Sequence, residues 1–334
     1  MKAMVLRTFR PIEKNPLELT DLPISLPGPE EILVRIKVCG VCHTDLHTVE
    51  GELRGVKLPA IPGHQIVGFV ERAGEKCVRF QKGDRVGIAW LHSACGVCSF
   101  CRDGKENLCL NAHFTGYHAD GGYAQYMVVP EKFAYSIPEI FSDEAAAPLL
   151  CAGIIGYRAL RLSGVKPGQN LGLYGFGASA HVAIQVAVNR GCRVCVFSRS
   201  REHQELAKKL GALWTGTAKD EPPVQMNGSI IFAPAGELVL DALKNTERGG
   251  TVALAGIYMS PIPEMEYQKH IYHERVLRSV ANATRQDGEE LLNAAAAIPI
   301  RTITQVFPLE EANQVLRRLK EGGISGAAIL RIPD

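Results

Sequence analysis

The pattern of hydrophobic and polar positions changes near residue 150. Before it, short apolar runs at 32–38, 65–72 and 85–90 are separated by turn clusters such as 26–29 and 81–84. Short runs bounded by Gly, Pro and Asp favour β-strands over helices. The first part of the chain therefore predicts an all-β domain that is partly barrel-like.

From about residue 155 to 290, strand-like and helix-like patterns alternate. We predict strands at 170–174, 193–197, 229–232, 251–255 and 276–280, and helices at 178–189, 201–210 and 237–243. Such alternation indicates parallel βαβ units. A helix at 309–320 and a strand at 327–332 predict that the tail returns to the first domain. The fold class is α/β, with one domain at 1–150 plus 296–334 and a doubly wound domain at 151–295.

Length and charge exclude several classes of partner. A chain of 334 residues fits about two domains, and a net charge of +2 gives no basic surface for nucleic acid. The sequence has neither a signal peptide nor a run of about 18 apolar residues. We therefore expect a cytoplasmic protein with no nucleic-acid or membrane partner.

The cysteines are distributed unevenly. Seven of the ten lie between Cys39 and Cys109. A chain of this size does not need disulfides, and clustered cysteines in a reducing compartment more often bind metal or take part in catalysis. This concentration makes a metal site the first functional hypothesis.

One cysteine cluster has the spacing of a structural zinc site. It reads C-x-x-C-x-x-C with a fourth cysteine eight positions later, and its members are Cys95, Cys98, Cys101 and Cys109. Four thiolates complete a tetrahedral Zn²⁺ site and leave no position for substrate. The alternative is two disulfides or free thiols. We expect this lobe to stabilise its loop rather than to catalyse a reaction.

A second group of candidate ligands is dispersed. Cys42, His64 and Cys151 lie in three separate short motifs. Each alone fits a buried cysteine or a structural histidine. Together, two thiolates and one imidazole would leave a fourth zinc position open, where the metal could act as a Lewis acid.

These motifs carry a family resemblance. The segments 40–45 (GVCHTD), 63–68 (GHQIVG) and 151–153 (CAG), with the four-cysteine lobe, closely resemble the zinc-containing alcohol dehydrogenases of the medium-chain dehydrogenase/reductase family. The resemblance implies a partly open, GroES-like β-barrel that carries the catalytic zinc and a Rossmann cofactor domain. It also implies two Zn²⁺ per chain and reversible hydride transfer between NAD(P) and small to medium primary alcohols or their aldehydes.

The resemblance also implies roles for individual residues. The three dispersed donors would hold the catalytic zinc. Thr44 would take the substrate proton, and His47 would pass it toward solvent. Asp45 would orient the zinc-bound imidazole, and His43 would contact the cofactor pyrophosphate. The alternative for His47 is an ordinary surface histidine on a helix.

The sequence departs from the family at three places. Gln65 stands where the family usually has Glu beside the zinc histidine, so the site loses a negative charge; we hypothesise a stronger Lewis acid and altered ligand exchange. Ile155 replaces a threonine that often faces the cofactor. The segment 326–328 lacks an arginine that often binds the pyrophosphate.

The cofactor motif follows the strand predicted at 170–174. Gly175, Gly177 and Ala180 fit G-x-G-x-x-A between a strand and a helix, which favours a dinucleotide. About 20 residues later, Ser198 occupies the position where NAD enzymes usually carry an acid, and Arg199 follows. A guanidinium without a competing carboxylate suits a 2′-phosphate, so NADP(H) is preferred. The alternative is NAD(H), with Arg199 stacking on adenine or facing water.

The remaining candidates concern substrate and assembly. The resemblance places Leu53 and Trp90 in the substrate pocket, with Ile257 and Tyr117 as weaker candidates. Trp90 could instead be a core residue. We expect His92, His113 and His118 to be ordinary loop residues rather than a further metal site. The resemblance implies a homodimer or homotetramer.

Particular residues disfavour three other functions. A polyol or sugar dehydrogenase of the same family is disfavoured by Cys151, because polyol enzymes often use an acidic ligand in that region. A zinc-free quinone or enoyl reductase is disfavoured by Cys42 and His64 together. A catalytically silent cofactor-binding protein is disfavoured by the retained zinc ligands and relay residues.

Overall fold

The computed structural model describes residues 1–298 and 300–334, which form two compact units. The first unit contains Met1–Cys151, Thr284–Asn293 and Arg301–Asp334, and the second contains Ala152–Ala283 and Ala294–Ile300. The chain enters the first unit at Thr284, leaves it at Ala294 and returns at Arg301, so these crossings lie on either side of the boundary expected at 296. The first turns of helix α9 (Arg285–Ala297) belong to the segment that enters at Thr284.

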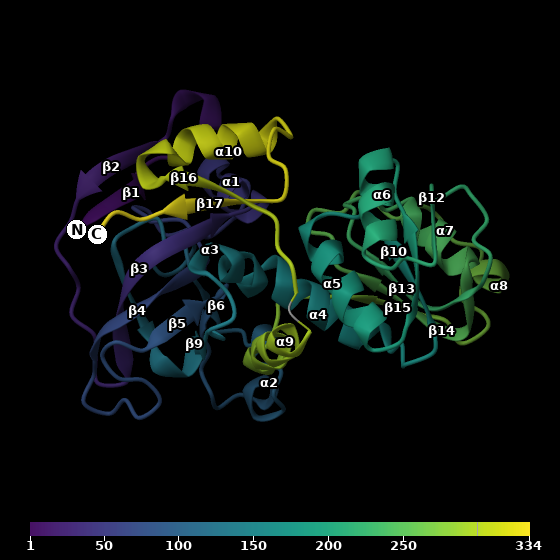
Figure 1. The fold of residues 1–334 in the computed structure, drawn as a ribbon, viewed down its shortest axis with the longest axis horizontal. Helices are drawn as coiled ribbons and strands as arrows, with labels where there is room; N and C mark the ends of the chain where they lie inside the picture. Colours follow the sequence, from purple (N-terminus) through teal and green to yellow (C-terminus); the bar gives the residue numbers. More distant parts are fainter. Residues whose placement is uncertain (299) are drawn as a thin grey trace. The chain divides into compact units, whose positions relative to one another are not determined.

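The first unit is built on a seven-stranded sheet (Figure 1). Its strand order is β16-β17-β3-β4-β5-β9, with β8 also paired to β3, and all pairs except β16–β17 are antiparallel. The strands are β3 (Glu31–Val41), β4 (Gln65–Ala73), β5 (Arg85–Ile88), β8 (Tyr126–Pro130), β9 (Ala134–Ser136), β16 (Thr304–Pro308) and β17 (Ala327–Arg331). Two hairpin-like pairs flank it: β1 (Lys2–Leu6) with β2 (Leu17–Asp21), and β6 (Leu91–Ser93) with β7 (His113–Phe114).

Short helices connect these strands. The α-helices of the first unit, besides the start of α9, are α1 (His43–Glu50), α2 (Ser99–Arg102), α3 (Asp143–Ala146) and α10 (Ala312–Lys320). Single 3₁₀ turns are η1 (Ile12–Lys14), η2 (Glu106–Leu108), η3 (Glu131–Phe133), η4 (Ala147–Leu150) and η5 (Leu309–Glu311). The helix predicted at 309–320 thus begins as a 3₁₀ turn and becomes α-helical at Ala312.

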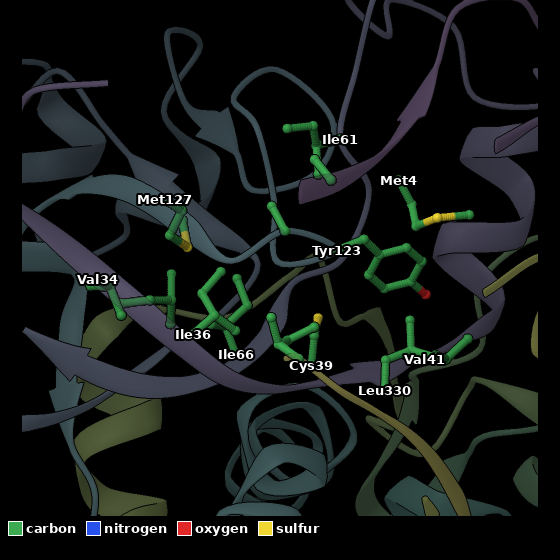
Figure 2. Close-up of a cluster of buried hydrophobic side chains, with 14 of the residues drawn as sticks. Met4, Val34, Ile36, Cys39, Val41, Ile61, Ile66, Tyr123, Met127 and Leu330 are labelled. Carbon is green, nitrogen blue, oxygen red and sulfur yellow. The ribbon is translucent and has the colours of Figure 1, made fainter. Parts of the chain in front are cut away.

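Apolar residues of β1, β3, β4 and β17 pack together with Tyr123 in the core of the first unit (Figure 2). Met4, Ile66 and Leu330 are at most 2% exposed, and Tyr123 is fully buried. Each such side chain contributes about 1.5–3 kcal/mol when it leaves water. This core fixes the sheet beneath the loops that carry the metal-binding motifs.

The second unit is a six-stranded parallel sheet, which confirms the predicted Rossmann-like βαβ architecture. The order is β12-β11-β10-β13-β14-β15, so successive strands run outward in both directions from the β10–β13 pair. The strands are β10 (Asn170–Tyr174), β11 (Arg193–Phe197), β12 (Trp214–Gly216), β13 (Met226–Ile231), β14 (Thr246–Leu254) and β15 (Val276–Ser279). The helices are α4 (Ala152–Ser163), α5 (Ala178–Asn189), α6 (Arg201–Lys209), α7 (Leu238–Lys244), α8 (Tyr267–His270) and the end of α9.

The strand order locates a ligand crevice by topology. Ligands of open parallel sheets bind outside the carboxyl ends of the strands where the direction of winding reverses. Here that point lies between β10 and β13, and the glycine motif follows β10 directly.

Among residues 1–298 and 300–334, no single helix is long and apolar enough to span a bilayer. The bent pair Asp143–Leu150 and Ala152–Ser163 meets the criterion only when the two helices are taken together, by length and composition alone.

Candidate active site

Three dispersed residues of the first unit converge at one point. One donor atom each from Cys42, His64 and Cys151 lies within 4.8 Å of the others. Cys42 precedes α1, His64 precedes β4, and Cys151 follows η4. The Cys42 Sγ lies 3.3 Å from the His64 Nε2. The fold therefore assembles a two-thiol, one-imidazole group from segments far apart in sequence.

The sequence around Cys42 both starts a helix and presents a donor. The Cys42 Sγ accepts the backbone N–H of Thr44 at 3.3 Å, and Asp45 accepts the backbone N–H of Cys42 at 2.9 Å. This is a reciprocal capping box, with cysteine as the N-cap in place of the usual serine or threonine. Because both ends of the cap are tied, the position of the Cys42 Sγ is fixed by the backbone.

Asp45 links this cap to the imidazole. Its Oδ1 lies 3.0 Å from the His64 Nδ1 and accepts the Gly63 N–H at 3.2 Å. Its Oδ2 also accepts the Tyr123 hydroxyl at 3.2 Å, and Asp45 is 2% exposed. A carboxylate on Nδ1 fixes the tautomer whose Nε2 lone pair points at the metal position. The orienting contact predicted for Asp45 is therefore present in the geometry.

Gly63 allows the imidazole to sit this close to the core. It adopts φ +99°, and a Cβ there would lie 2.5 Å from Tyr123 Cδ1 and 2.7 Å from Cys39 Sγ. Any side chain at this position would displace the turn that carries His64.

The pKa shifts of Cys42, His64 and Cys151 describe a site that fits a cation. The Cys151 thiol donates to Cys42 and holds the pKa of Cys42 well below its ordinary value, while that same contact raises the pKa of Cys151. Burial opposes a charge on His64, but Cys42 and Asp45 outweigh it and raise the pKa of His64. Thiolate, thiol and imidazole in a buried volume are the donor set that Zn²⁺ prefers, so these residues fit the metal.

Gln65 begins β4 directly after His64. It pairs with Gly40 of β3, and a Cβ on Gly40 would come within 2.9 Å of the Gln65 side chain. Gln65 is 3% exposed. The neutral amide therefore occupies a buried position beside a ligand, where a carboxylate would add a charge.

Aromatic side chains line the neighbourhood of His64. Trp90 packs its ring edge-on to the imidazole with centroids 4.9 Å apart, and Phe114 stacks on Trp90 at 5.1 Å. Tyr117 lies against Trp90 at 5.8 Å, and its hydroxyl donates to the backbone oxygen of Arg54. Trp90 lies between β5 and β6, whereas the sequence pattern predicted it as the last residue of a strand at 85–90.

The other predicted pocket residues are more open. Leu53 is half-buried in the loop after α1. Ile257 belongs to the second unit, where 60% of its surface is exposed.

The predicted relay residues lie on α1. Thr44 and His47 are three positions apart and therefore share one helix face, and both are half-buried. His43, the first residue of α1, is exposed. The His47 Nδ1 contacts the Glu52 carboxylate, a partner that sequence reasoning did not identify.

The four-cysteine lobe also gathers its donors within 4.8 Å. The Cys109 Sγ lies 3.5 Å from the Cys95 Sγ, and backbone N–H groups of Val97 and Cys98 lower the pKa of Cys95 to about 6. Burial and the neighbouring thiols raise the pKa of Cys101 to about 12. A cysteine that ionises easily, next to three further thiols, fits a closed Zn²⁺ site.

Within the described residues, these two groups are the only sets of three or more His, Cys, Asp or Glu side chains positioned to bind a metal. His92, His113 and His118 form no such group; the rings of His113 and His118 lie 5.6 Å apart.

The second unit carries the glycine motif between β10 and α5. Gly175 follows β10, and Gly177 is the N-cap of α5. A Cβ on Gly177 would meet no described atom within 4 Å, while Ala180 is fully buried. The first N–H groups of this 12-residue helix have no capping side chain, and such a helix start suits a phosphate.

The end of β11 presents hydroxyl and guanidinium groups. The buried Ser198 Oγ accepts the Ser200 N–H at 3.3 Å, and the Gln204 side chain donates to the Ser198 backbone oxygen at 2.7 Å. Arg199 is exposed beside them. No carboxylate occupies the position directly after this strand.

Sequence reasoning missed three contributors. Tyr123 bonds Asp45, Phe114 stacks on Trp90, and Glu52 contacts His47. Tyr123 and Phe114 carry no motif. Glu52 is five residues beyond His47, outside helical pairing distance, and only the glycine that ends α1 could have indicated it.

Comparisons with known proteins agree with this geometry. Residues 28–139 match the family described as alcohol dehydrogenase GroES-like domain, and residues 180–297 match zinc-binding dehydrogenase. The chain is 46% identical to a probable alcohol dehydrogenase AdhA of Mycobacterium tuberculosis, over 99% of this chain and 97% of that protein. It is 38% identical to an alcohol dehydrogenase of Geobacillus stearothermophilus, over 99% and 100%. A cinnamyl alcohol dehydrogenase from Sorghum bicolor superposes with a TM-score of 0.89 at 25% identity, covering 99% and 97%.

Proposed function

This chain belongs to the zinc-type alcohol dehydrogenases of the medium-chain dehydrogenase/reductase family, and from that premise we propose that it interconverts small to medium primary alcohols and their aldehydes at a zinc held by Cys42, His64 and Cys151. It is an oxidoreductase that transfers hydride between an alcohol and a nicotinamide cofactor. The observation that carries the zinc assignment is the convergence of the three donors, with Asp45 behind the imidazole.

When bound, zinc would supply a Lewis acid for the substrate oxygen and the nicotinamide would supply or accept the hydride. The chain's own residues do the remaining work. Asp45 holds the His64 imidazole, and Thr44 and His47 offer a proton route along one face of α1. The aromatic residues beside His64 exclude water and offer an apolar wall to the substrate.

The decisive experiment follows reduced nicotinamide by absorbance with a panel of aliphatic and aromatic alcohols and aldehydes. We expect turnover that is lost on chelation and restored by Zn²⁺. Aliphatic primary alcohols of increasing length and an aromatic alcohol such as cinnamyl alcohol would define the pocket. Turnover of polyols alone, or no turnover of any alcohol by zinc-loaded protein, would contradict the proposal.

We further propose two Zn²⁺ per chain, the second in the four-cysteine lobe. The support is the second set of four donors within 4.8 Å and the low pKa, about 6, of Cys95. Metal analysis of active protein should give two zinc ions per chain. A value of one would remove the structural site.

NADP(H) is the proposed cofactor. The support is the buried Ser198 at the end of β11 with Arg199 exposed beside it. Equilibrium binding should be tighter for NADP⁺ than for NAD⁺, and Arg199→Ala should weaken NADP⁺ by about 10-fold or more while leaving NAD⁺ unchanged. Glu202→Gln, which changes charge three residues away, serves as the control. Tighter binding of NAD⁺ by the parent protein would overturn this preference.

For Gln65, the proposal is that its neutral amide keeps zinc a stronger Lewis acid. Gln65→Glu would place a charge in a position that is 3% exposed. We expect slower turnover and tighter zinc retention. Unchanged turnover and zinc exchange would show that the substitution has no electrostatic role.

Assembly and location complete the proposal. The edge strand β15 is mostly exposed and could pair with a second copy of the chain, giving a homodimer or homotetramer. Light scattering of the holoenzyme tests this, and a monomer would contradict it. We also propose a cytoplasmic location, which cell fractionation tests.

A further inference from the structure

The end of helix α1 returns the chain over its own last turns. Gly51 adopts φ +78°, and its N–H bonds to the Thr48 oxygen at 3.3 Å. The next N–H, of Glu52, bonds back to the His47 oxygen at 3.0 Å. This pattern is that of a glycine-terminated helix. A Cβ on Gly51 would also lie 2.9 Å from Phe9 Cβ, so glycine is required there. The backbone thus carries Glu52 to the turn that contains His47.

The side chains meet where the backbone brings them together. The Glu52 Oε2 contacts the His47 Nδ1. An ionised carboxylate can only accept, so Nδ1 carries the hydrogen and the neutral ring presents Nε2 as its accepting nitrogen. His47 is 23% exposed and Glu52 is 48% exposed. The His47 ring is therefore half-buried, and the Glu52 carboxylate that contacts it is in contact with water.

The charged side chains of α10 near α1 have partners of their own. Lys320 of α10 contacts Glu50 of α1 at 2.8 Å and Glu13 of η1 at 3.0 Å. Arg317 of α10 donates to the Glu13 backbone oxygen at 3.2 Å. His43 and Arg54, at the start of α1 and in the loop after it, are exposed. Among these groups, Glu52 is the carboxylate that contacts His47.

We propose that Glu52 is a positioning residue of the proton relay, which fixes the His47 tautomer and stabilises the imidazolium that forms when a proton reaches Nε2. The inference rests on the proposed alcohol oxidation, which releases one proton from the substrate hydroxyl. That proton arrives at Nε2, the carboxylate shares the positive charge through Nδ1–H, and one proton is then released to water. The arrangement matches Asp45 behind His64, but it stands at the solvent-facing end of the route.

The test replaces the charge and keeps the shape. In Glu52→Gln, the amide oxygen can still accept from Nδ1, but the carboxylate no longer favours the imidazolium. We expect the pH midpoint of kcat for alcohol oxidation to move down by about 0.5–1 unit at low salt, with a smaller shift at high salt. Glu52→Asp should restore part of the shift. Glu18→Gln, which removes the same charge from an exposed pair with Arg7, should leave the midpoint unchanged.

A second readout does not depend on turnover. The imidazole resonance of His47, assigned with His47→Gln, is titrated by NMR in zinc-loaded protein without nicotinamide. Its midpoint should fall by the same amount in Glu52→Gln. In the His47→Gln background, Glu52→Gln should not shift the rate profile further.

Unchanged midpoints in both measurements would overturn the inference, as would a shift that persists without His47. If no alcohol is turned over, the proposed function fails, whereas the NMR titration still decides whether Glu52 and His47 are coupled.

Discussion

The two cysteine clusters of the first unit use the same ligand atom in opposite ways. The lobe takes all four thiols from residues 95–109, so one loop can fold around one ion. The three-donor site takes Cys42, His64 and Cys151 from segments that the sheet must first bring together. Metal binding by the lobe therefore requires only that its own loop is folded. Metal binding by the three-donor site requires that the whole unit is folded. The four thiols of the lobe would fill all four positions of a tetrahedral zinc. The three donors of the dispersed site would leave the fourth position for substrate.

Their surroundings differ in the same sense. The dispersed site has a buried carboxylate behind its imidazole and aromatic rings beside it. The lobe is held mainly by backbone N–H groups and by Glu106, which accepts from the Arg285 backbone N–H at 3.0 Å and guanidinium at 3.1 Å. This difference supports the proposal that the first site orients a ligand and the second stabilises a loop.

The largest effect should come from removing one dispersed ligand. In Cys151→Ala, we expect kcat/KM to fall by about 10³-fold or more, because the Lewis acid supplies several kcal/mol to the transition state. Zinc content should fall from two to one, with a small change in thermal unfolding. Retained turnover with one zinc lost would break the comparison, since the reactive metal would then lie in the lobe.

The converse change removes one ligand of the lobe. In Cys98→Ala, we expect stability to fall by about 2–4 kcal/mol, measured by denaturant unfolding of zinc-loaded protein, with kcat largely kept in the folded fraction. Cys77→Ala is the matched control, because Cys77 is a half-buried cysteine outside both clusters. A loss of kcat without loss of stability would show that the lobe takes part in catalysis.

A smaller effect is expected behind the imidazole. Asp45→Asn keeps the size of the side chain but removes the charge that holds the His64 Nδ1–H. Such changes typically cost about 10–100-fold in metal affinity or activity. Zinc affinity by competition with a chelator and kcat/KM should fall together. The matched change Tyr123→Phe removes only the hydroxyl bond to Asp45 and should cost less. If Tyr123→Phe weakened zinc as much as Asp45→Asn did, the charge would not be the cause.

Much of the fold and of the two donor groups could be predicted from sequence, because short local motifs specify them. The strands Asn170–Tyr174 and Arg193–Phe197 and the helix Ala178–Asn189 were predicted with their observed limits, because their apolar periods and flanking glycines are strong. Trp90 was predicted as the last residue of a strand at 85–90, but β5 ends two residues earlier, at Ile88. The two donor groups were predicted from spacing and family resemblance, and the structure brings the members of each together.

What sequence could not supply is contact between distant segments. Tyr123 reaches Asp45 across 78 positions, and nothing in its local pattern marks it. Helix α4 was not identified, because Gly153 and Gly156 stand among its first five residues and glycine has a low helix propensity. The segment that enters the first unit at Thr284 brings Arg285 into contact with Glu106, 179 positions away. Long-range pairing of this kind follows from the packed fold and not from local preference.

The smallest effect should separate the lobe from the dispersed site by pH. His92, on strand β6 before the lobe, has Nε2 3.4 Å from the Val128 oxygen, and its buried Nδ1 has no partner among the described residues. Burial lowers the pKa of His92 below its ordinary 6.5, so the folded state favours the neutral ring. The stabilisation that comes from a neutral His92 is fully present above about pH 6.5. It is lost as the pH falls through the lower pKa that His92 has in the folded state. In His92→Gln, the decline of Tm between pH 7 and pH 5 should be shallower than in the parent by about 1–2 °C. If Tm fell equally in both proteins, protonation of His92 would not be the cause of the acid sensitivity, and the strand before the lobe would not contribute to it.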